Sequence, residues 1–446
     1  MKVRVRFAPS PTGQVHIGNM RAALYNWLFA RHMGGQFLLR IEDTDRERST
    51  PQAVQTVLDV MAWLGLDVDE PPLYQSSRRE AHQAAAESLV ARGHAYRSDK
   101  GGTGRGEAIL FRMPGTDMSF HDEIKGDLVK PAADLKDFVI VRSDGLPVFH
   151  LANVVDDIEM RITHVIRGDD HIENTYRHVA LFRALGAELP KYAHLPMIVN
   201  AQGKPYSKRD GDAYVGEFKE KGYLPETLFN FLALLGWSPG EGREVVPRDE
   251  MIACFDLARV RSAPSQFDPV KLHWMNGEYM RRLPAGMCEA GCIGNLRAQP
   301  WFDGNPSAIE TARKVLAIMG DRIKRFAETA EQTIYFFTDS FPWDEKAVRK
   351  RLMKEGAADL LATLRPRLAA AEPFDAPSLE GVLHAVAGER GVGVAEFIHP
   401  VRVAVSGRAT GPGLFDLLAV LGRECVLRRI DRALDGIRDR SLPGSA

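Results

Sequence analysis

Two different periodicities of apolar positions follow one another near the start of the chain. Positions 2–7 alternate between basic and apolar side chains, which is typical of a half-buried strand. Met20, Leu24 and Leu28 then repeat at helical spacing, and residues 37–41 form a mainly apolar run that is typical of a buried parallel strand. We therefore predict a strand–helix–strand unit with a right-handed crossover.

The same alternation continues to about residue 210, and helical spacing dominates the rest. One helix is predicted to open at Thr50 and close at Gly65, and another to run from Ser77 to Gly93. Further strands are predicted over 138–141, 149–155, 164–166 and 195–199, with a helix over 172–185. The last third is predicted to hold helices only, over 309–330, 345–372, 378–390 and 413–436. The pattern predicts an α/β fold with a Rossmann-like, doubly wound parallel sheet, followed by an all-helical domain.

The composition is that of an ordinary globular protein. The 446 residues, 45% hydrophobic and 26% charged, argue against a disordered or fibrous chain and suffice for about three domains. No apolar run approaches the ~18 residues that span a bilayer, so we expect no membrane partner. The balance of 58 basic against 59 acidic residues neither demands nor excludes nucleic acid as a partner. Four scattered cysteines argue against a disulfide framework and favour a reduced, cytoplasmic setting.

Polar side chains gather where the first two predicted strands end. Arg6 and Ala8 close the first strand, and Glu42 follows the second. His16 and Gly18 stand at the start of the intervening helix, where free backbone N–H groups attract phosphate and a glycine lets a flat ring approach closely. Because ligands bind at the carboxyl ends of parallel strands, we expect these residues to form one site. Any one of them alone would fit an ordinary loop and helix cap equally well.

A second group of polar residues follows the strand predicted at 195–199. Residues 203–211 form a glycine-bounded loop with three cations, Lys204, Lys208 and Arg209. Such a loop can close over a polyphosphate and stabilise charge that develops in a transition state. A solvated basic turn is the alternative, and the loop by itself does not decide between them.

Several ordered motifs together resemble the bacterial glutamyl-tRNA synthetases, which are class I aminoacyl-tRNA synthetases. The first runs from Arg6 to Gly18 and contains Ser-Pro-Thr-Gly, where glutaminyl enzymes carry Glu-Pro-Asn-Gly. Others are Arg-Ile-Glu-Asp-Thr-Asp at 40–45, His-Leu-Ala-Asn-Val-Val-Asp-Asp at 150–157, Val-Ile-Arg-Gly-Asp-Asp-His at 165–171, Ser-Lys-Arg at 207–209, and Pro-Gly-Leu-Phe at 412–415. The resemblance covers essentially the whole chain.

The resemblance implies a glutamate–tRNA ligase. Such enzymes activate L-glutamate with ATP to glutamyl-adenylate, then transfer the acyl group to the 3′-terminal ribose of tRNA. Magnesium would arrive with ATP, whose phosphates supply most of its ligands. By similarity, the residues expected to handle ATP are His16, Gly18, Lys204, Ser207, Lys208 and Arg209, with His16 and Lys208 catalytic. Those expected to bind glutamate are Arg6, Ala8, Ser10, Glu42, Phe149, Asn153 and Arg167.

The resemblance also implies a domain plan. It places the Rossmann-like catalytic domain at 1–210, with a short acceptor-end insertion at about 94–147. A helical region that contacts the tRNA stem follows at 211–305, and an all-helical anticodon-binding domain at 306–446. A cytoplasmic monomer is expected, with glutamate tRNA as partner and glutamine tRNA as a possible second one.

Departures from the family pattern keep other functions open. Pro205 and Tyr206 stand where a lysine and an aliphatic residue are usual, and Phe149 replaces a tyrosine. The segment between Tyr96 and Phe111 is short and lacks cysteines, so we expect no zinc. The alternatives are a paralogous ligase that glutamylates a non-standard tRNA or another acceptor, and a catalytically silent tRNA-binding paralogue.

Overall fold

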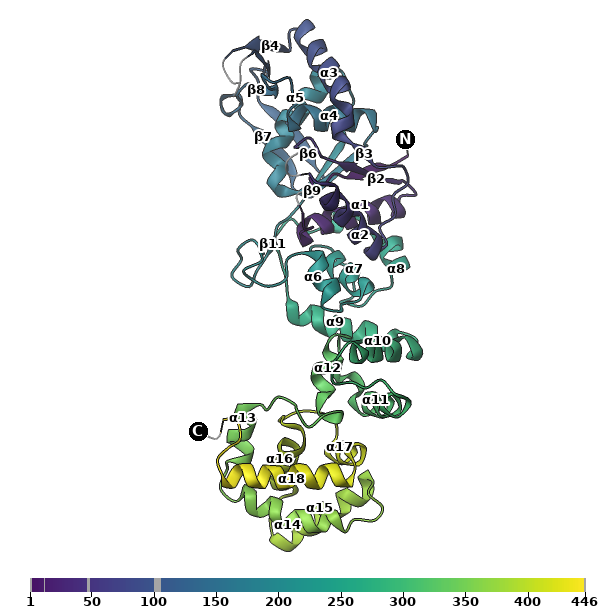
Figure 1. Cartoon of the computed structure of the whole chain (residues 1–446). Helices are drawn as coiled ribbons and strands as arrows, with labels where there is room; N and C mark the ends of the chain where they lie inside the picture. The colour runs from purple at the N-terminus through teal and green to yellow at the C-terminus, as the bar shows by residue number, and fades with distance from the viewer. Residues whose placement is uncertain (1, 12, 46–48, 100–105, 445–446) are drawn as a thin grey trace. The chain divides into compact units, whose positions relative to one another are not determined.

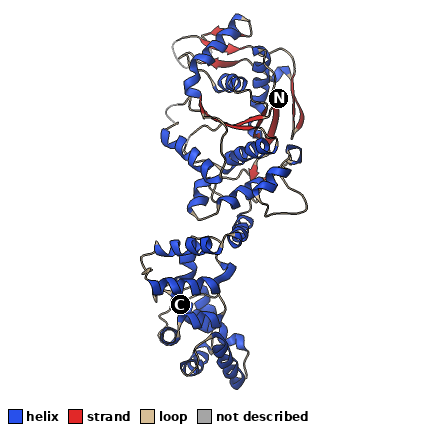
Figure 2. Ribbon diagram, turned by 90° about the vertical axis from the view of Figure 1, so that its right-hand side faces the viewer, coloured by secondary structure: helices blue, strands red, loops and turns tan. Residues whose placement is uncertain are grey.

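The computed structural model describes residues 2–11, 13–45, 49–99 and 106–444. Thr12 of the first motif therefore lies outside the described residues. The chain divides into two compact units, Met1–Met275 and Asn276–Ala446. Strands are found in the first unit, and the described part of the second is built of helices and loops (Figure 2). The α/β domain followed by an all-helical domain is thus confirmed.

The first unit begins with the predicted strand–helix–strand arrangement. A parallel sheet in the order β1-β2-β3 contains β1 (Arg4–Phe7), β2 (Gln36–Ile41) and β3 (Leu73–Tyr74). The connecting helices are α1 (Ile17–His32) and α2 (Pro51–Leu64) (Figure 1). The predicted ends of α2 are confirmed, because the Thr50 side chain accepts from the Ala53 N–H and Gly65 adopts a left-handed conformation with φ 66°. α1 is buried nearly all round, since it packs against β1 and β9 (His164–Gly168) and also against α7 (Pro225–Ala233) and α8 (Arg248–Cys254).

A second sheet, in the order β7-β6-β10-β9, continues the first. Its parallel pair is β9 (His164–Gly168) and β10 (Lys191–Leu195), joined by α5 (Ile172–Leu185) as predicted. The hairpin of β6 (Met118–Asp122) and β7 (Gly126–Lys130) adds to the β10 edge. The Thr163 N–H donates to the Arg4 carbonyl oxygen over 2.9 Å, which places the start of β9 beside β1. The carboxyl ends of β1, β2, β9 and β10 consequently face one region.

The strand predicted at 149–155 is wrong, because this segment forms helix α4 (Phe149–Glu159). Leu151, Val154, Val155 and Ile158 follow helical spacing and pack into one apolar cluster. The β-branched residues in this run favour a strand locally, but packing of the apolar face against neighbouring elements stabilises the helix. α4 packs between α3 (Arg79–Ala91), α5 and the antiparallel sheet β4 (Ala95–Ser98), β5 (Ala108–Phe111) and β8 (Phe138–Val141).

Two predicted boundaries also shift. Ser77 does not cap α3, because its hydroxyl donates to the Tyr74 carbonyl within a 3₁₀ turn over Gln75–Arg78. The strand predicted at 195–199 is two strands, since β10 ends at Leu195 and β11 (Ile198–Val199) pairs with β12 (Ser265–Gln266). Pro196, which has no N–H to donate, separates them. The rest of this unit is mainly helical, with α6 (Val215–Glu220), α7 (Pro225–Ala233), α8 (Arg248–Cys254) and the start of α9 (Pro269–Arg282).

The second unit is a helical assembly. Its longer helices are α10 (Ala285–Arg297), α11 (Pro306–Met319), α14 (Ala357–Ala369), α15 (Ala376–Arg390), α16 (Val394–Ser406), α17 (Leu414–Leu421) and α18 (Arg423–Arg438). Its largest core includes Leu361, Leu383, Phe397 and Ile430, all fully buried. Across the described ranges of both units, no helix combines the length and apolar character needed to cross a membrane.

Candidate active site

A cavity of about 530 Å³ opens at the carboxyl ends of the parallel strands. It brings together nine of the predicted residues: Arg6, Ala8, Ser10, His16, Gly18, Glu42, Phe149, Asn153 and Arg167. Four others, Lys204, Ser207, Lys208 and Arg209, lie on the neighbouring loop, which lines the cavity through Pro205 and Tyr206 instead. The site is thus assembled from β1, β2, α4, β9 and the start of α1, as expected for an open parallel sheet.

Arg6 is held by a carboxylate that the sequence did not single out. Its Nε and Nη2 atoms lie 3.0 and 3.2 Å from the two oxygens of Asp157, and Arg40 donates to the same carboxylate. Burial alone would raise the pKa of Asp157, but Arg40 and Arg6 outweigh it and hold that pKa below its usual value. The positive charge of Arg6 is therefore largely compensated within the protein.

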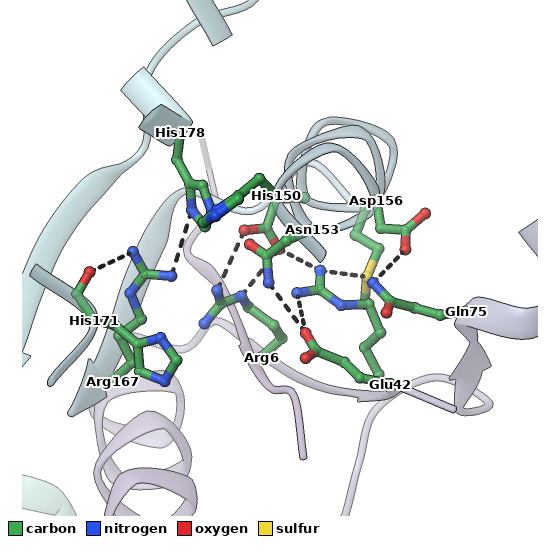
Figure 3. A network of polar contacts seen from close by, with 12 residues as sticks. Arg6, Glu42, Gln75, His150, Asn153, Asp156, Arg167, His171 and His178 are labelled. Carbon is green, nitrogen blue, oxygen red and sulfur yellow. Dashed lines mark hydrogen bonds and ion pairs between the residues drawn. The ribbon is translucent and has the colours of Figure 1, made fainter. Parts of the chain in front are cut away.

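Glu42 and Asn153 form an acceptor pair on the cavity wall (Figure 3). The Asn153 amide donates to Glu42 Oε1 over 3.1 Å, and Arg40 Nη2 donates to the same oxygen over 3.1 Å. The Asn153 Oδ1 is buried and has no hydrogen-bond partner among the described residues. A carboxylate and an amide oxygen side by side suit an ammonium group, which has only donors.

Arg167 has a different environment from that of Arg6. It is 8% exposed, and its polar partners among the described residues are His194, His178, Thr175 and the backbone oxygen of His171. None of these is a carboxylate. Burial and then the charge of Arg6 lower the pKa of Arg167 to about 10, so the group stays cationic at neutral pH. The charges of Asp157 and Glu42 oppose this shift, but no described carboxylate pairs directly with Arg167. A buried cation without an ion-pair partner is suited to bind an anionic group such as a carboxylate.

Neutral histidines surround this guanidinium (Figure 3). Burial, followed by the charges of Arg177 and Arg167, lowers the pKa of His150 to about 4. Burial and Arg167 likewise lower the pKa of His171 to about 4, and they hold that of His178 well below its usual value. The Phe149 ring packs among them, with its centroid 5.4 Å from that of His150 and 5.7 Å from that of His178. Of these rings, Phe149 and His171 line the cavity, and they add no charge to it.

The start of α1 forms another part of the cavity wall. His16 is the N-cap of α1, and its Nδ1 accepts from the Gly18 N–H over 3.1 Å. A Cβ at Gly18 would lie 3.3 Å from His16 Nδ1, so glycine keeps this surface open. Burial lowers the pKa of His16, although the Tyr206 backbone opposes the shift. The Ile17 and Gly18 N–H groups are both bonded within the protein, which differs from the expected free N–H groups at this helix start. The neutral His16 imidazole, whose Nδ1 accepts from Gly18, can donate from Nε2 to a phosphate oxygen.

The cationic loop meets this helix start through Tyr214. A β-bridge pairs Tyr214 with His16, and the Ile17 N–H donates to the Ala213 carbonyl over 2.9 Å. Lys208 Nζ lies 5.7 Å from the centroid of the Tyr214 ring. The two sequence groups that were predicted to handle one ligand are therefore adjacent.

Asp210 and Tyr206 give the loop its shape. The Asp210 carboxylate accepts from the Ser207 N–H and hydroxyl over 2.9 and 3.0 Å, and from the Asn200 amide over 2.7 Å. The Tyr206 ring, 7% exposed, stacks on Phe267 with a centroid distance of 4.4 Å. The unusual Tyr206 thus anchors the loop, while Lys204, Lys208 and Arg209 remain exposed.

Sequence reasoning missed Asp157 and His171 as parts of the site. Both stand inside quoted motifs, but the strand assigned to 149–155 hid the helical face that Asn153, Asp156 and Asp157 share. Helical spacing of the apolar residues in this segment was the signal that could have found that face. His171 ends the 3₁₀ turn Asp169–His171 that follows β9, and it lines the cavity.

Comparisons with known proteins agree with this geometry. Residues 2–103 and 101–274 match the family model "tRNA synthetases class I (E and Q), catalytic domain", and residues 296–434 match "Anticodon binding domain". A glutamate–tRNA ligase of Methylacidiphilum infernorum is 42% identical over 96% of this chain and 97% of its own length. One of Moorella thermoacetica is 39% identical over 98% and 99%. The crystal structure of a glutamate tRNA ligase from Elizabethkingia meningosepticum, in complex with its amino acid, superposes with a TM-score of 0.82 at 30% identity, covering 98% of this chain and 100% of that one. The chain therefore belongs to the glutamate–tRNA ligase family of class I tRNA synthetases.

Proposed function

We propose that this protein activates L-glutamate with ATP and transfers the glutamyl group to the 3′-terminal ribose of tRNA. The observation that carries the proposal is Arg167, a buried cation whose described partners are all neutral. It is available for the side-chain carboxylate of glutamate, with Arg6 beside it. Glu42 and Asn153 take the ammonium group, which directs the α-carboxylate towards the start of α1.

Charge complementarity selects glutamate over glutamine at Arg167. The carboxylate of glutamate compensates the buried guanidinium and accepts its hydrogen bonds. The neutral amide of glutamine would leave a desolvated cation without an anion, at a cost on the order of 3–5 kcal/mol. Arg6 cannot supply this discrimination alone, because Asp157 already compensates it.

Activation requires positioning and charge stabilisation. An oxygen of the α-carboxylate attacks the α-phosphorus of ATP, the bond to the bridging oxygen breaks, and pyrophosphate leaves with the electron pair. His16 and Gly18 hold the nucleotide at the start of α1, where the imidazole can donate and the absent Cβ leaves room, and magnesium enters with ATP as part of the substrate. Lys208 stabilises the charge that develops at phosphorus, and Lys204, Ser207 and Arg209 complete the loop that covers the phosphates. Since Lys208 does not line the cavity here, we expect the loop to close over bound ATP.

The two units have different roles towards tRNA in this proposal. The helical part at 296–434 that matches the anticodon-binding family overlaps most of the proposed domain 306–446, which holds the anticodon end. The segment 94–147, with its hairpin of β6 and β7, holds the acceptor end, and region 211–305 contacts the stem. The partner is glutamate tRNA, with glutamine tRNA a second substrate to be tested, and the enzyme acts as a monomer without zinc.

The proposal is tested by ATP–pyrophosphate exchange with glutamate or glutamine, with and without tRNA, followed by aminoacylation of purified tRNAs. Exchange that depends on glutamate and acylation of glutamate tRNA are expected. Exchange without acylation of either tRNA would instead favour a ligase with another acceptor, and no exchange in any combination would favour the silent tRNA-binding paralogue. Elemental analysis for zinc and light scattering for the mass in solution test the remaining points.

A further inference from the structure

A buried relay connects the β6–β7 hairpin to Arg167. His194 Nδ1 lies 2.6 Å from Asp122 Oδ2, and His194 Nε2 lies 3.3 Å from Arg167 Nε and 3.0 Å from Thr175 Oγ1. Thr175 Oγ1 in turn lies 2.7 Å from Arg167 Nη2. We propose that Asp122, His194 and Thr175 are positioning residues that fix the Arg167 side chain for the substrate's side-chain carboxylate, an inference that rests on the proposed function.

The hydrogen-bond partners of Asp122 determine which ring nitrogen of His194 carries the proton. The Asp122 carboxylate also accepts from the backbone N–H groups of His194, Ile124 and Lys125, over 3.1, 3.0 and 2.8 Å. An acceptor surrounded by donors stays ionised, and His194 lowers the pKa of Asp122 although burial opposes it. His194 therefore carries its proton on Nδ1, facing Asp122.

The second nitrogen of His194 must then be an acceptor, which is what Arg167 requires. A guanidinium has donors only, so the Nε–H of Arg167 can bind the lone pair of Nε2 but not a protonated nitrogen. Burial lowers the pKa of His194 even though Asp122 opposes the shift, which keeps the ring neutral. The Thr175 hydroxyl fits the same arrangement, since it can accept from Arg167 Nη2 while it donates to Nε2 or to the His171 carbonyl oxygen.

A second chain of neutral rings supports the other side of the guanidinium. His178 Nδ1 lies 3.5 Å from Arg167 Nη1, and its Nε2 lies 3.2 Å from His150 Nδ1. Arg167 is thus oriented from several directions by neutral acceptors, none of which forms an ion pair with it. Arg6 differs in this respect, because the carboxylate of Asp157 both orients its guanidinium and compensates its charge. The difference explains how one arginine of the pair stays available to an anionic substrate.

The relay could instead serve only to join strands, because Asp122 is the β6 residue that pairs with β10 in register. The two roles predict different effects when a residue of the relay is replaced. Loss of a strand contact lowers stability and affects both substrates alike. Loss of a positioning contact to Arg167 weakens glutamate binding selectively and leaves ATP binding unchanged.

The test compares Asp122→Asn with Thr175→Val and Thr175→Ser in the full-length protein. An asparagine at 122 can turn its NH₂ group towards Nδ1, which favours the tautomer that points an N–H at Arg167. Valine keeps the shape of Thr175 but removes the acceptor, and serine keeps the hydroxyl. We expect Asp122→Asn and Thr175→Val to raise the KM for glutamate about tenfold, as for loss of one hydrogen bond to a charged group. The KM for ATP should change less than about twofold, and serine should restore near-normal glutamate binding.

Tyr192→Phe is the matched control, since this buried ring stacks on His194 with a centroid distance of 6.1 Å. Its hydroxyl has no described hydrogen-bond partner, so its loss should leave both KM values unchanged. Equal rises in the KM for glutamate and ATP, or a fall in kcat and melting temperature alone, would overturn the inference. An unchanged KM for glutamate in Thr175→Val would do the same even if Asp122→Asn failed to fold. A wild-type protein without glutamate-dependent exchange would overturn the proposed function instead.

Discussion

Replacing Asp157 by asparagine removes the carboxylate that Arg6 and Arg40 share. The three side chains are 2%, 3% and 0% exposed, so water cannot replace the lost charge. Removing one partner of a buried ion pair costs roughly 3–5 kcal/mol. Because Glu42 still accepts from Arg40 over 3.1 Å, we expect a value near the lower end, about 3 kcal/mol of unfolding free energy.

The effect should also depend on pH in a defined direction. Burial alone would raise the pKa of Asp157, but Arg40 and Arg6 lower it in the folded state. A depressed folded-state pKa stabilises the fold fully above the unfolded value of about 3.9 and loses that contribution as pH falls through the folded value. The difference between wild type and Asp157→Asn should therefore be constant from about pH 5 to 8 and shrink below about pH 4.

Urea unfolding followed by hydrogen exchange measures the stability of each of the two units separately. Peptides from α4 should lose protection at lower urea in Asp157→Asn, whereas peptides from α14 in the second unit should not change. Glu87→Gln is the control, because its pair with Arg97 is 46% and 55% exposed and should contribute less than about 1 kcal/mol. A cost below about 1 kcal/mol for Asp157→Asn would refute the reasoning that the buried arginines depend on this carboxylate.

Three further changes test the roles of single residues. Lys208→Ala should lower the rate of adenylate formation about 10²- to 10³-fold and leave tRNA binding, measured by filter retention, nearly unchanged; the exposed Lys221, paired with Asp212, provides the control Lys221→Ala. Arg167→Gln should reduce kcat/KM for glutamate by on the order of 10³-fold while the value for glutamine changes far less, and equal losses for both amino acids would contradict the assigned contact. Tyr206→Ala should detach the loop from Phe267 and lower kcat with little change in the KM for glutamate, and pyrophosphate-exchange kinetics that match wild type would argue against an anchoring role.

Local periodicity explains which parts of the fold could be predicted from the sequence. The first strand, helix α1 and the second strand each show a clear periodicity of apolar positions. Thr50 and Gly65 mark the ends of α2 because threonine caps helix starts and glycine adopts the left-handed conformation that ends helices. The residues at the ends of these elements were predictable because parallel strands place their carboxyl ends together. The prediction of a strand over 149–155 was wrong because the β-branched residues of this segment favour a strand locally. Packing against α3 and α5 stabilises the helix instead.

The pairing of charges could not be predicted, although it decides the chemistry of the site. Arg6 and Arg167 are the same residue type at the ends of two adjacent strands, and nothing local distinguishes them. Asp157 lies 151 positions from Arg6, and Asp122 lies 72 positions from His194. These distant partners make one arginine compensated and leave the other cationic towards the cavity. In the proposed mechanism, specificity for an anionic side chain thus depends less on the presence of arginine than on which buried acceptors the tertiary fold brings to each guanidinium.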